Sequence, residues 1–174
     1  MRNCIDIILE RRSIRSFKKD PVPDDILLKI IEAAQYAPSS WNRQPWRFIV
    51  IRDKTKLKRI SEILPYGKFL SNVPMAIAII ASEKESDLWI VDGSVATENL
   101  MLAAENYGLG TCWIAESDND EIKRMLEIPD DFHIITITPI GYPERIPKAP
   151  KRKNIEEILF NEKFGKRYLE TKYL

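Results

Sequence analysis

The sequence predicts one mixed domain in which helices and strands alternate along the chain. Its 174 residues suffice for a single core, and 44% hydrophobic with 30% charged residues is typical of folded globular proteins. Segments with the apolar spacing of amphipathic helices alternate with short apolar runs that fit buried strands. Taken alone, this alternation favours a doubly wound fold with a parallel sheet. The sequence shows no repeat, low-complexity tract or linker, so residues 1–174 are expected to form a single domain.

Two amphipathic helices are expected near the N-terminus. Residues 3–11 place three large aliphatic side chains on one face of a short helix. A second helix begins at Pro23, because proline suits the first turn and the two aspartates that follow favour the helix dipole. Pro38 stops this helix, because a proline ring is incompatible with a helix interior.

Two strands and a capped helix follow. WRFIVIR, residues 46–52, is expected to form a strand, and the apolar run MAIAII, residues 75–80, a buried strand. Asp53 is placed to cap the helix that begins KTKLK. A long helix is then expected over about 87–107. Its Gly93 costs about 1 kcal/mol relative to alanine, which indicates close packing there.

The C-terminal half continues with strands and an irregular tail. Gly108 is expected to end the long helix as its C-cap. Residues 111–115 and 133–141 are predicted strands, with a helix starting at Asp118 between them. Prolines make 143–151 an extended segment, and the tail from about 150 is predicted to be basic and then helical.

Composition excludes several classes of partner. A net charge of +1 gives no general attraction to nucleic acid or to a membrane surface. No run of about 18 apolar residues exists and the N-terminus is unlike a signal peptide, so a cytoplasmic protein without a membrane span is expected. Cys4 and Cys112 have no metal or redox spacing, so reduced thiols are expected, Cys112 is expected to be packed, and no metal site is predicted.

Several enzyme classes are excluded by motif. The single histidine, His133, rules out a three-histidine zinc site, would have to carry any Ser-His-Asp triad alone, and is expected to be structural. The only Gly-x-Gly, GLG at 108–110, lacks the third glycine of a dinucleotide fingerprint, and no P-loop occurs.

Two basic segments lie near the ends of the chain. RRSIRSF, residues 11–17, carries three arginines and two serines, and KRK occupies residues 151–153. If the two segments meet in space they form a phosphate-sized anion site, because arginine forks bind phosphate oxygens. Each segment alone also fits a solvated basic face.

These segments belong to a longer series of motifs. RRSIRSF, APSSWNRQPWRF, YGLGTCWI and PIGYP, followed by KRK and IEEILFNEKFG, match the FMN-dependent nitroreductase family in order and spacing. The chain resembles this family over essentially its whole length. The resemblance implies an α+β fold of three layers, α/β/α, with a largely antiparallel central sheet instead of a parallel one. It also implies an intertwined homodimer with two FMN sites at the subunit interface.

By this resemblance, the RRSxR segment contacts FMN. Arg11 and Ser13 are expected at the phosphate and ribityl chain, with Arg12 beside them, and Arg15 near the pyrimidine edge of the ring. The loop from the partner subunit is expected to lie along the isoalloxazine through Pro38, Ser39 and Ser40, with Asn42 hydrogen-bonded to the ring.

The remaining expected contacts come from three places. Gln44 and Trp46 are expected to buttress the loop as buried residues, and Trp41 to pack at the dimer interface. The backbone of Leu109 and Gly110 is expected to face flavin O4 and N5. Arg152 matches the family's basic residue on the phosphate, with Lys153 next to it. The register is open by one residue, so Lys151 remains an alternative.

The implied activity is an NAD(P)H-dependent FMN oxidoreductase. Hydride would pass from NAD(P)H to flavin N5, and electrons would then pass to a nitroaromatic, quinone or similar small acceptor by a ping-pong mechanism. No side chain is expected to act as a general acid or base, because the flavin carries the chemistry. Another flavin enzyme on the same fold (a dehalogenase, dehydrogenase or flavin-fragmenting enzyme) and a non-catalytic flavin-binding module remain alternatives. The sequence specifies neither the acceptor nor the choice between NADH and NADPH.

Overall fold

The computed structural model describes residues 3–168 of the chain. Its centre is a sheet with strand order β1-β2-β4-β3. The strands are β1 (Trp46–Ile51), β2 (Met75–Ser82), β3 (Gly110–Thr111) and β4 (Phe132–Gly141). All pairings between these strands are antiparallel. The parallel sheet favoured by alternation is therefore wrong, and the antiparallel sheet implied by the resemblance is confirmed. Alternation of helices and strands does not distinguish the two sheets, because the strand after a helix can run parallel or antiparallel to the strand before it.

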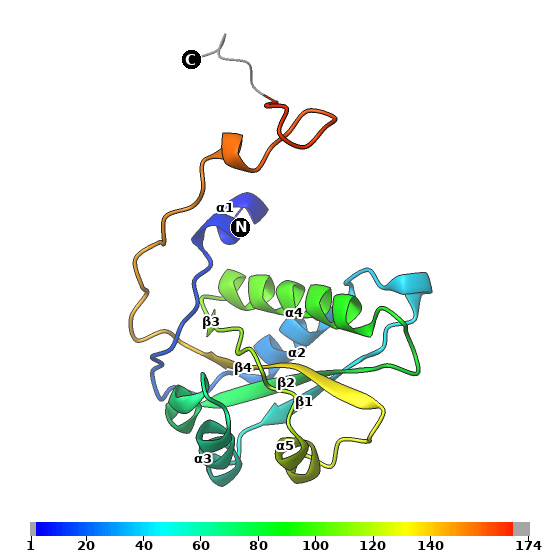
Figure 1. Ribbon diagram of the computed structural model, residues 1–174. Coiled ribbons are helices and arrows are strands. Elements are labelled where there is room, and N and C mark those ends of the chain that lie inside the picture. The colour runs from blue at the N-terminus through cyan, green and yellow to red at the C-terminus, as the bar shows by residue number, and fades with distance from the viewer. Residues whose placement is uncertain (1–2, 169–174) are drawn as a thin grey trace.

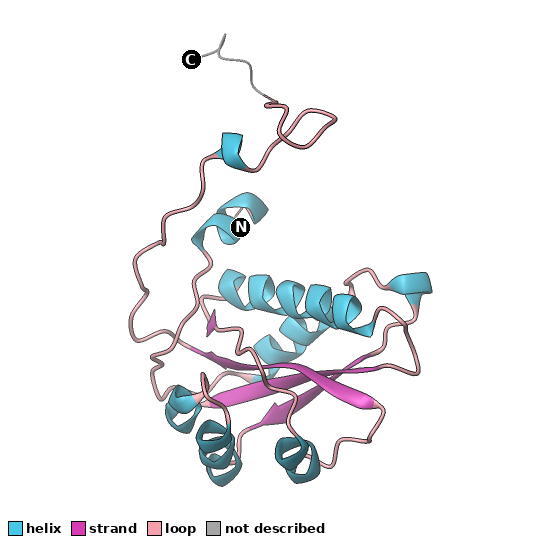
Figure 2. Ribbon diagram, viewed as in Figure 1, coloured by secondary structure: helices cyan, strands magenta, loops and turns pink. Residues whose placement is uncertain are grey.

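Helices cover both faces of the sheet, which gives three layers (Figures 1 and 2). The helices α2 (Asp24–Gln35) and α4 (Trp89–Asn106) lie on one face, and α3 (Lys54–Ile63) and α5 (Asp120–Met125) lie on the other. The short α1 (Cys4–Glu10) lies on the outer side of α4. None of the helices within residues 3–168 has the length and apolar character needed to cross a bilayer.

The strand β2 is the centre of the core, and all of its side chains are buried. Successive side chains of a strand point to opposite faces. Its odd-numbered residues accordingly pack with Ile30 of α2 and Leu100 of α4, and its even-numbered residues with Leu57 of α3 and Ile122 of α5. This burial on both faces explains why the run MAIAII has no polar residue.

Several local predictions are confirmed. Asp53 caps α3 by accepting from the N–H of Lys56 at 2.8 Å. A Cβ added at Gly93 would lie 2.6 Å from Ile135 Cγ1, so α4 approaches the sheet closely at this glycine. Gly108 follows α4 with φ of +72°, the left-handed conformation of a C-terminal glycine. Small residues of α4 thus serve the chain's own core.

The strand predicted at 111–115 is wrong beyond its first residue, because β3 ends at Thr111. The N–H groups of Cys112 and Ile114 donate to the hydroxyl oxygens of Thr138 and Thr136, at 3.4 Å and 3.1 Å. Hydroxyl groups of β4 therefore accept the backbone hydrogen bonds of this segment, in place of the carbonyl groups of a paired strand.

The helix predicted to start at Asp118 begins later, after its cap Asn119. Asp118 instead contacts His133 Nδ1 at 2.9 Å and accepts from the N–H of Ile134 at 3.0 Å. The ring of His133 also stacks on Trp89, with centroids 4.5 Å apart. These contacts agree with a structural role for the histidine.

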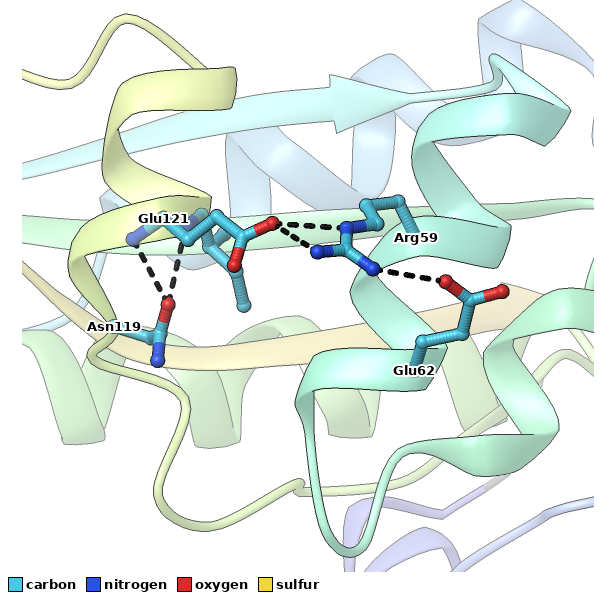
Figure 3. Close-up of polar contacts among 5 residues, drawn as sticks. Arg59, Glu62, Asn119 and Glu121 are labelled. Carbon is cyan, nitrogen blue, oxygen red and sulfur yellow. Dashed lines mark hydrogen bonds and ion pairs between the residues drawn. The ribbon is translucent and has the colours of Figure 1, made fainter.

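An ion-pair network joins α3 to α5 on the surface (Figure 3). The guanidinium of Arg59 donates twice to Glu121 Oε1, at 2.8 Å and 2.6 Å, and once to Glu62 Oε2 at 3.2 Å. Asn119 accepts from the N–H of Glu121 at 2.9 Å and so caps α5 beside this network. The two helices on this face are thereby held side by side.

The helical tail is not observed. Residues 144–168, here called the C-terminal arm, run away from the body of the domain (Figure 1) and contain only a single turn of 3₁₀ helix, Ile155–Glu157. Helices gain most of their stability from packing of an apolar face. Within its own chain the arm leaves such residues exposed, including Ile158 and Phe164, the latter at 94%. The end of the predicted helix lies outside the described residues.

Candidate functional site

The arginine segment, residues 11–15, leaves α1 and runs beside β3. Ser13 forms a parallel bridge with Thr111, and the N–H of Ile14 donates to Thr111 O at 2.8 Å. A Cβ added at Gly110 would come within 2.5 Å of Ile14 Cγ1. A side chain at position 110 would therefore displace the arginine segment, and this close approach explains the glycine.

The three arginines of this segment have different surroundings. Arg11 Nε lies 3.7 Å from Glu98 Oε1 on α4. Arg12 donates to Leu9 O at 2.7 Å and to Arg11 O at 2.8 Å. Its positive charge therefore lies against the carbonyl groups at the C-terminal end of α1. Arg15 is exposed. Arg12 thus has a structural task, whereas Arg15 is open to a ligand.

Two cavities adjoin Arg15. The larger, about 630 Å³, is lined by four basic residues, Arg15, Lys18, Lys19 and Lys54, and by the apolar Phe17 and Phe69 among others. The smaller, about 320 Å³, is lined by Ser13, Arg15, Ser16, Arg145 and Pro147. Positive charge and hydrogen-bond donors therefore converge next to the arginine segment.

Cys112 is packed beside the same segment. Burial raises the pKa of its thiol, whereas the charge of Arg15, a hydrogen bond with Ser13 and the charge of Arg11 all act to lower it. The expectation of a packed thiol is confirmed, because Cys112 is buried. A raised pKa disfavours the reactive thiolate, so the residue is suited to packing.

The serine loop, residues 38–44, has a strained backbone. Trp41, Asn42 and Gln44 have φ of 52°, 55° and 50°, and each left-handed residue of this kind costs roughly 1–2 kcal/mol. The N–H of Gln44 donates to Ser39 Oγ at 3.0 Å, and Gln44 Nε2 donates to Asn42 O at 3.1 Å. Gln44 braces the loop, but it is exposed and not buried as predicted. The prediction that Trp46 is buried is confirmed.

The serine loop is attached to the N-terminal end of α4. The N–H of Ser40 donates to Asp92 Oδ1 at 3.0 Å. Arg43 Nη1 lies 3.9 Å from Asp87 Oδ2, just before the helix. Trp41 projects from the loop and is 88% exposed. The loop is therefore fixed at its base and open at its tip.

The predicted site residues consequently form two groups at opposite ends of α4. Ser13 and Gly110 lie beyond its C-terminal end, where β3 follows the helix, and the serine loop lies at its N-terminal end (Figure 1). From Asp92 to Asn106 the helix rises about 21 Å. Within one chain, the serine loop and the residues around Gly110 are therefore held well apart.

Leu109 and Gly110 both take part in the packing and hydrogen bonding of their own chain. The N–H of Leu109 already donates to Ala104 O at 2.9 Å, and its side chain is buried in the core. The main-chain N–H of Leu109 thus has an acceptor within its own chain. Gly110 is buried as well, and it pairs with Gly141 of β4.

Arg152 and Lys153 lie on the exposed C-terminal arm. The arm starts close to the arginine segment, because Ala149 and Arg12 line one cavity of about 380 Å³. Three residues span at most about 11 Å, so Arg152 lies within that reach of Ala149. The joining of the two basic segments at one phosphate therefore stays a prediction.

The family assignment follows from sequence comparison. The nitroreductase family model matches residues 8–65 and 63–142. The chain belongs to the nitroreductase family. A protein of Archaeoglobus fulgidus, named as a candidate NADH dehydrogenase/NAD(P)H nitroreductase, is 38% identical over 152 residues, which cover 83% of this chain and 87% of that one. FMN reductase (NAD(P)H) of Bacillus subtilis is 31% identical over 175 residues, which cover 87% of this chain and 70% of that one.

Solved structures support this nitroreductase assignment. An FMN-dependent nitroreductase from Clostridium difficile R20291 superposes with a TM-score of 0.83 and 36% identity, covering 90% of this chain and 98% of that one.

Two residues of this nitroreductase-family chain were not singled out from its sequence. Arg145 lines a cavity with Ser13 and Arg15, and its position in an extended basic segment was an available signal. Asp92 holds the serine loop, and no local pattern indicates it.

Proposed function

We propose that this protein is an NAD(P)H-dependent oxidoreductase that uses FMN and reduces a nitroaromatic, quinone or similar small acceptor by a ping-pong mechanism. When bound, FMN supplies the redox chemistry, taking hydride from NAD(P)H and passing electrons to the acceptor. Membership of the nitroreductase family and the names of its relatives support this function. The chain is proposed to act as one domain, residues 1–174.

The residues present fit FMN. The phosphate needs charge-assisted donors, which Arg11 and Ser13 are proposed to supply, with Arg145 beside them at the cavity that Ser13 lines. The missing side chain of Gly110 makes room for Ile14, which holds the arginine segment beside β3, where the ring is proposed to lie. The polar serine loop offers hydroxyl and amide groups for the ring's carbonyl and nitrogen edge.

The observation that carries the proposed assembly is the separation of the two groups along α4. About 21 Å of helix lies between Asp92 and Asn106, so a single ring cannot contact the serine loop and Gly110 of the same chain. Two chains related by a twofold axis would bring the serine loop of one to the arginine segment of the other. The site is therefore proposed to form only in a homodimer.

Exposed apolar residues supply a surface for that dimer. Ile5, Ile8 and Leu9 of α1 face solvent within one chain, as do Trp41 and Phe164. The three side chains of α1 lie together on one short helix, and exposed apolar patches mark interaction sites in soluble proteins. A second copy would cover α1 and the C-terminal arm, which explains why the arm is ordered away from its own body.

Each residue group then has a defined task. Arg11 and Ser13, with Arg152 or Lys153 of the arm, would bind the phosphate, with Arg145 and Arg12 beside them. Arg15 would lie by the pyrimidine edge, where its cation stabilises negative charge on the reduced ring. Pro38, Ser39, Ser40 and Asn42 of the partner chain, braced by Gln44, would orient the ring and exclude water from its edge.

Anaerobic spectroscopy tests this function. The purified protein should be yellow and release FMN, not FAD, on denaturation. NADH or NADPH should bleach the flavin, and a panel of nitroaromatics and quinones should restore its colour. A colourless protein that fails to bind added FMN at micromolar concentration contradicts the cofactor, and a flavin that neither nicotinamide bleaches contradicts the reductase.

A further inference from the structure

Asp92 is a carboxylate inside the domain. It lies in the first turn of α4 and is only 3% exposed. A buried carboxylate is costly unless hydrogen bonds replace its lost water. Both of its oxygens have donors, since Oδ1 accepts from the N–H of Ser40 at 3.0 Å and Oδ2 accepts from Ser86 Oγ at 2.7 Å. Its two partners lie on different segments of the chain.

Ser86 fixes the orientation of this carboxylate. Ser86 is buried, and its Oγ accepts from the N–H of Leu88 at 3.2 Å. With that lone pair in use, the hydroxyl proton is directed to Asp92 Oδ2. The other carboxylate oxygen is thereby turned toward the serine loop before any ligand binds.

The serine loop needs such an anchor. Three of its residues, Trp41, Asn42 and Gln44, have left-handed backbones, which non-glycine residues adopt only when their surroundings hold them there. The bond from Ser40 to Asp92 enters the loop immediately before the first of these residues. It is also charge-assisted, and such hydrogen bonds are about twice as strong as neutral ones.

We propose that Asp92 is a positioning residue that holds the serine loop in its ligand-binding conformation before FMN arrives. The inference rests on the proposed function, because it takes residues 38–42 as the flavin contact. Preorganisation of a loop raises affinity by removing the cost of ordering it on binding. Asp92 touches neither cofactor nor substrate in this account and acts only through Ser40.

Three variants and one control separate this role from a general effect on stability. Asp92→Ala removes both hydrogen bonds. Asp92→Asn keeps an acceptor for Ser40 and can donate to Ser86, so it should rescue the loop. Ser86→Ala frees one carboxylate oxygen and keeps the other. Asp25→Ala is the matched control, because Asp25 lies in the first turn of α2 and does not contact the loop.

Amide hydrogen exchange and FMN affinity are the two measurements. In the FMN-free protein, Asp92→Ala should speed exchange in peptides covering 38–44 and leave those covering 111–115 unchanged. It should weaken FMN binding by about tenfold to a hundredfold, the loss of one hydrogen bond to a charged group. Asp92→Asn keeps a neutral hydrogen bond of about half the strength, so its loss should be only about threefold to tenfold, and Asp25→Ala should change neither property.

The outcomes are distinguishable. Wild-type protein that binds no FMN contradicts the proposed function and the flavin half of this inference, while exchange in 38–44 still decides whether Asp92 holds the loop. If Asp92→Ala does not fold, Ser86→Ala takes its place, with faster exchange in 38–44 and weaker FMN binding expected. Unchanged exchange in 38–44, or an equal loss of FMN affinity in the Asn and Ala variants, overturns the positioning role.

Discussion

Gly110 lies directly against Ile14, so close that a Cβ at position 110 would come within 2.5 Å of Ile14 Cγ1. Because Gly110 has no side chain, Ile14 can pack against it, and the segment that carries Arg11, Ser13 and Arg15 lies close to β3. Gly110→Ala should destabilise the fold by about 1–3 kcal/mol, the usual cost of overpacking, and weaken FMN binding. Gly108→Ala is the control: it should cost about 1 kcal/mol through its left-handed backbone without moving the arginines. Thermal unfolding with FMN titration of both variants checks this, and equal FMN affinity in the two would contradict it.

Arg15 and Arg152 should be separable by mutation. Arg152→Ala should weaken FMN binding by about 1.5–3 kcal/mol, the value of a charge-assisted contact, and leave the flavin potential unchanged because the phosphate is remote from the ring. Arg15→Ala should lower the potential, because its cation favours the reduced ring, with a smaller loss of affinity. A redox titration against reference dyes and an FMN dissociation measurement decide the matter. Lys29→Ala removes a positive charge from α2 as a control, and an unchanged potential in Arg15→Ala would refute the role of that residue.

Complementation between two impaired variants tests the shared site. Arg15→Ala and Asn42→Ala should each impair both sites of their own homodimer. In a heterodimer of the two, one site would carry both changes and the other neither, so about half of wild-type activity should return. Co-expression with two different tags isolates the heterodimer for steady-state assay. No recovery in it, or light scattering that shows an FMN-loaded monomer, would mean that both segments act within one chain.

Alkaline pH should reduce the contribution of Cys112 to the stability of the fold. Burial raises the pKa of its thiol, so the unfolded chain loses this proton first as the pH rises. The stability that the buried thiol provides is thus present below its ordinary pKa, about 8.5, and is lost as the pH climbs toward the raised value. The difference in unfolding free energy between wild type and Cys112→Ala should shrink as the pH rises above this ordinary value, by at most about 1.4 kcal/mol per pH unit. Cys4→Ala, which removes an exposed thiol, is the control, and a constant difference would show that the thiol does not titrate.

Local features of the fold were predictable because their partners are neighbours in sequence. The cap at Asp53 accepts from Lys56, and the glycine at 108 follows directly from the end of α4. The strand expected at 111–115 failed because Thr136 and Thr138 take the place of a backbone ladder. Periodicity does not report such long-range hydroxyl contacts. The helix predicted in the tail was wrong for a related reason. Its apolar spacing is helical, but the arm does not pack its apolar face against the body of its own chain.

In the candidate site, too, local residue patterns were predictable and long-range contacts were not. The residue types in RRSIR and PSSWN were informative because phosphate and a polar ring edge demand them. Asp92 was missed, since Ser40 lies 52 positions earlier in the chain and nothing near Asp92 sets it apart from other helix-starting acids. The distance between the two segments could come only from the structure, because it depends on the length and placement of α4.

The strand order β1-β2-β4-β3 has a consequence for synthesis on the ribosome. β2 pairs with β4, which begins only at Phe132, and β3 pairs with β4 alone. Until β4 emerges, β2 presents one open edge made of apolar residues, and open edges of this kind are prone to pair with other chains. Contacts so distant in sequence also form slowly. The nascent chain is therefore most vulnerable to aggregation between the emergence of Ser82 and that of Gly141, and a chaperone that shields exposed strands would act on this protein during that interval.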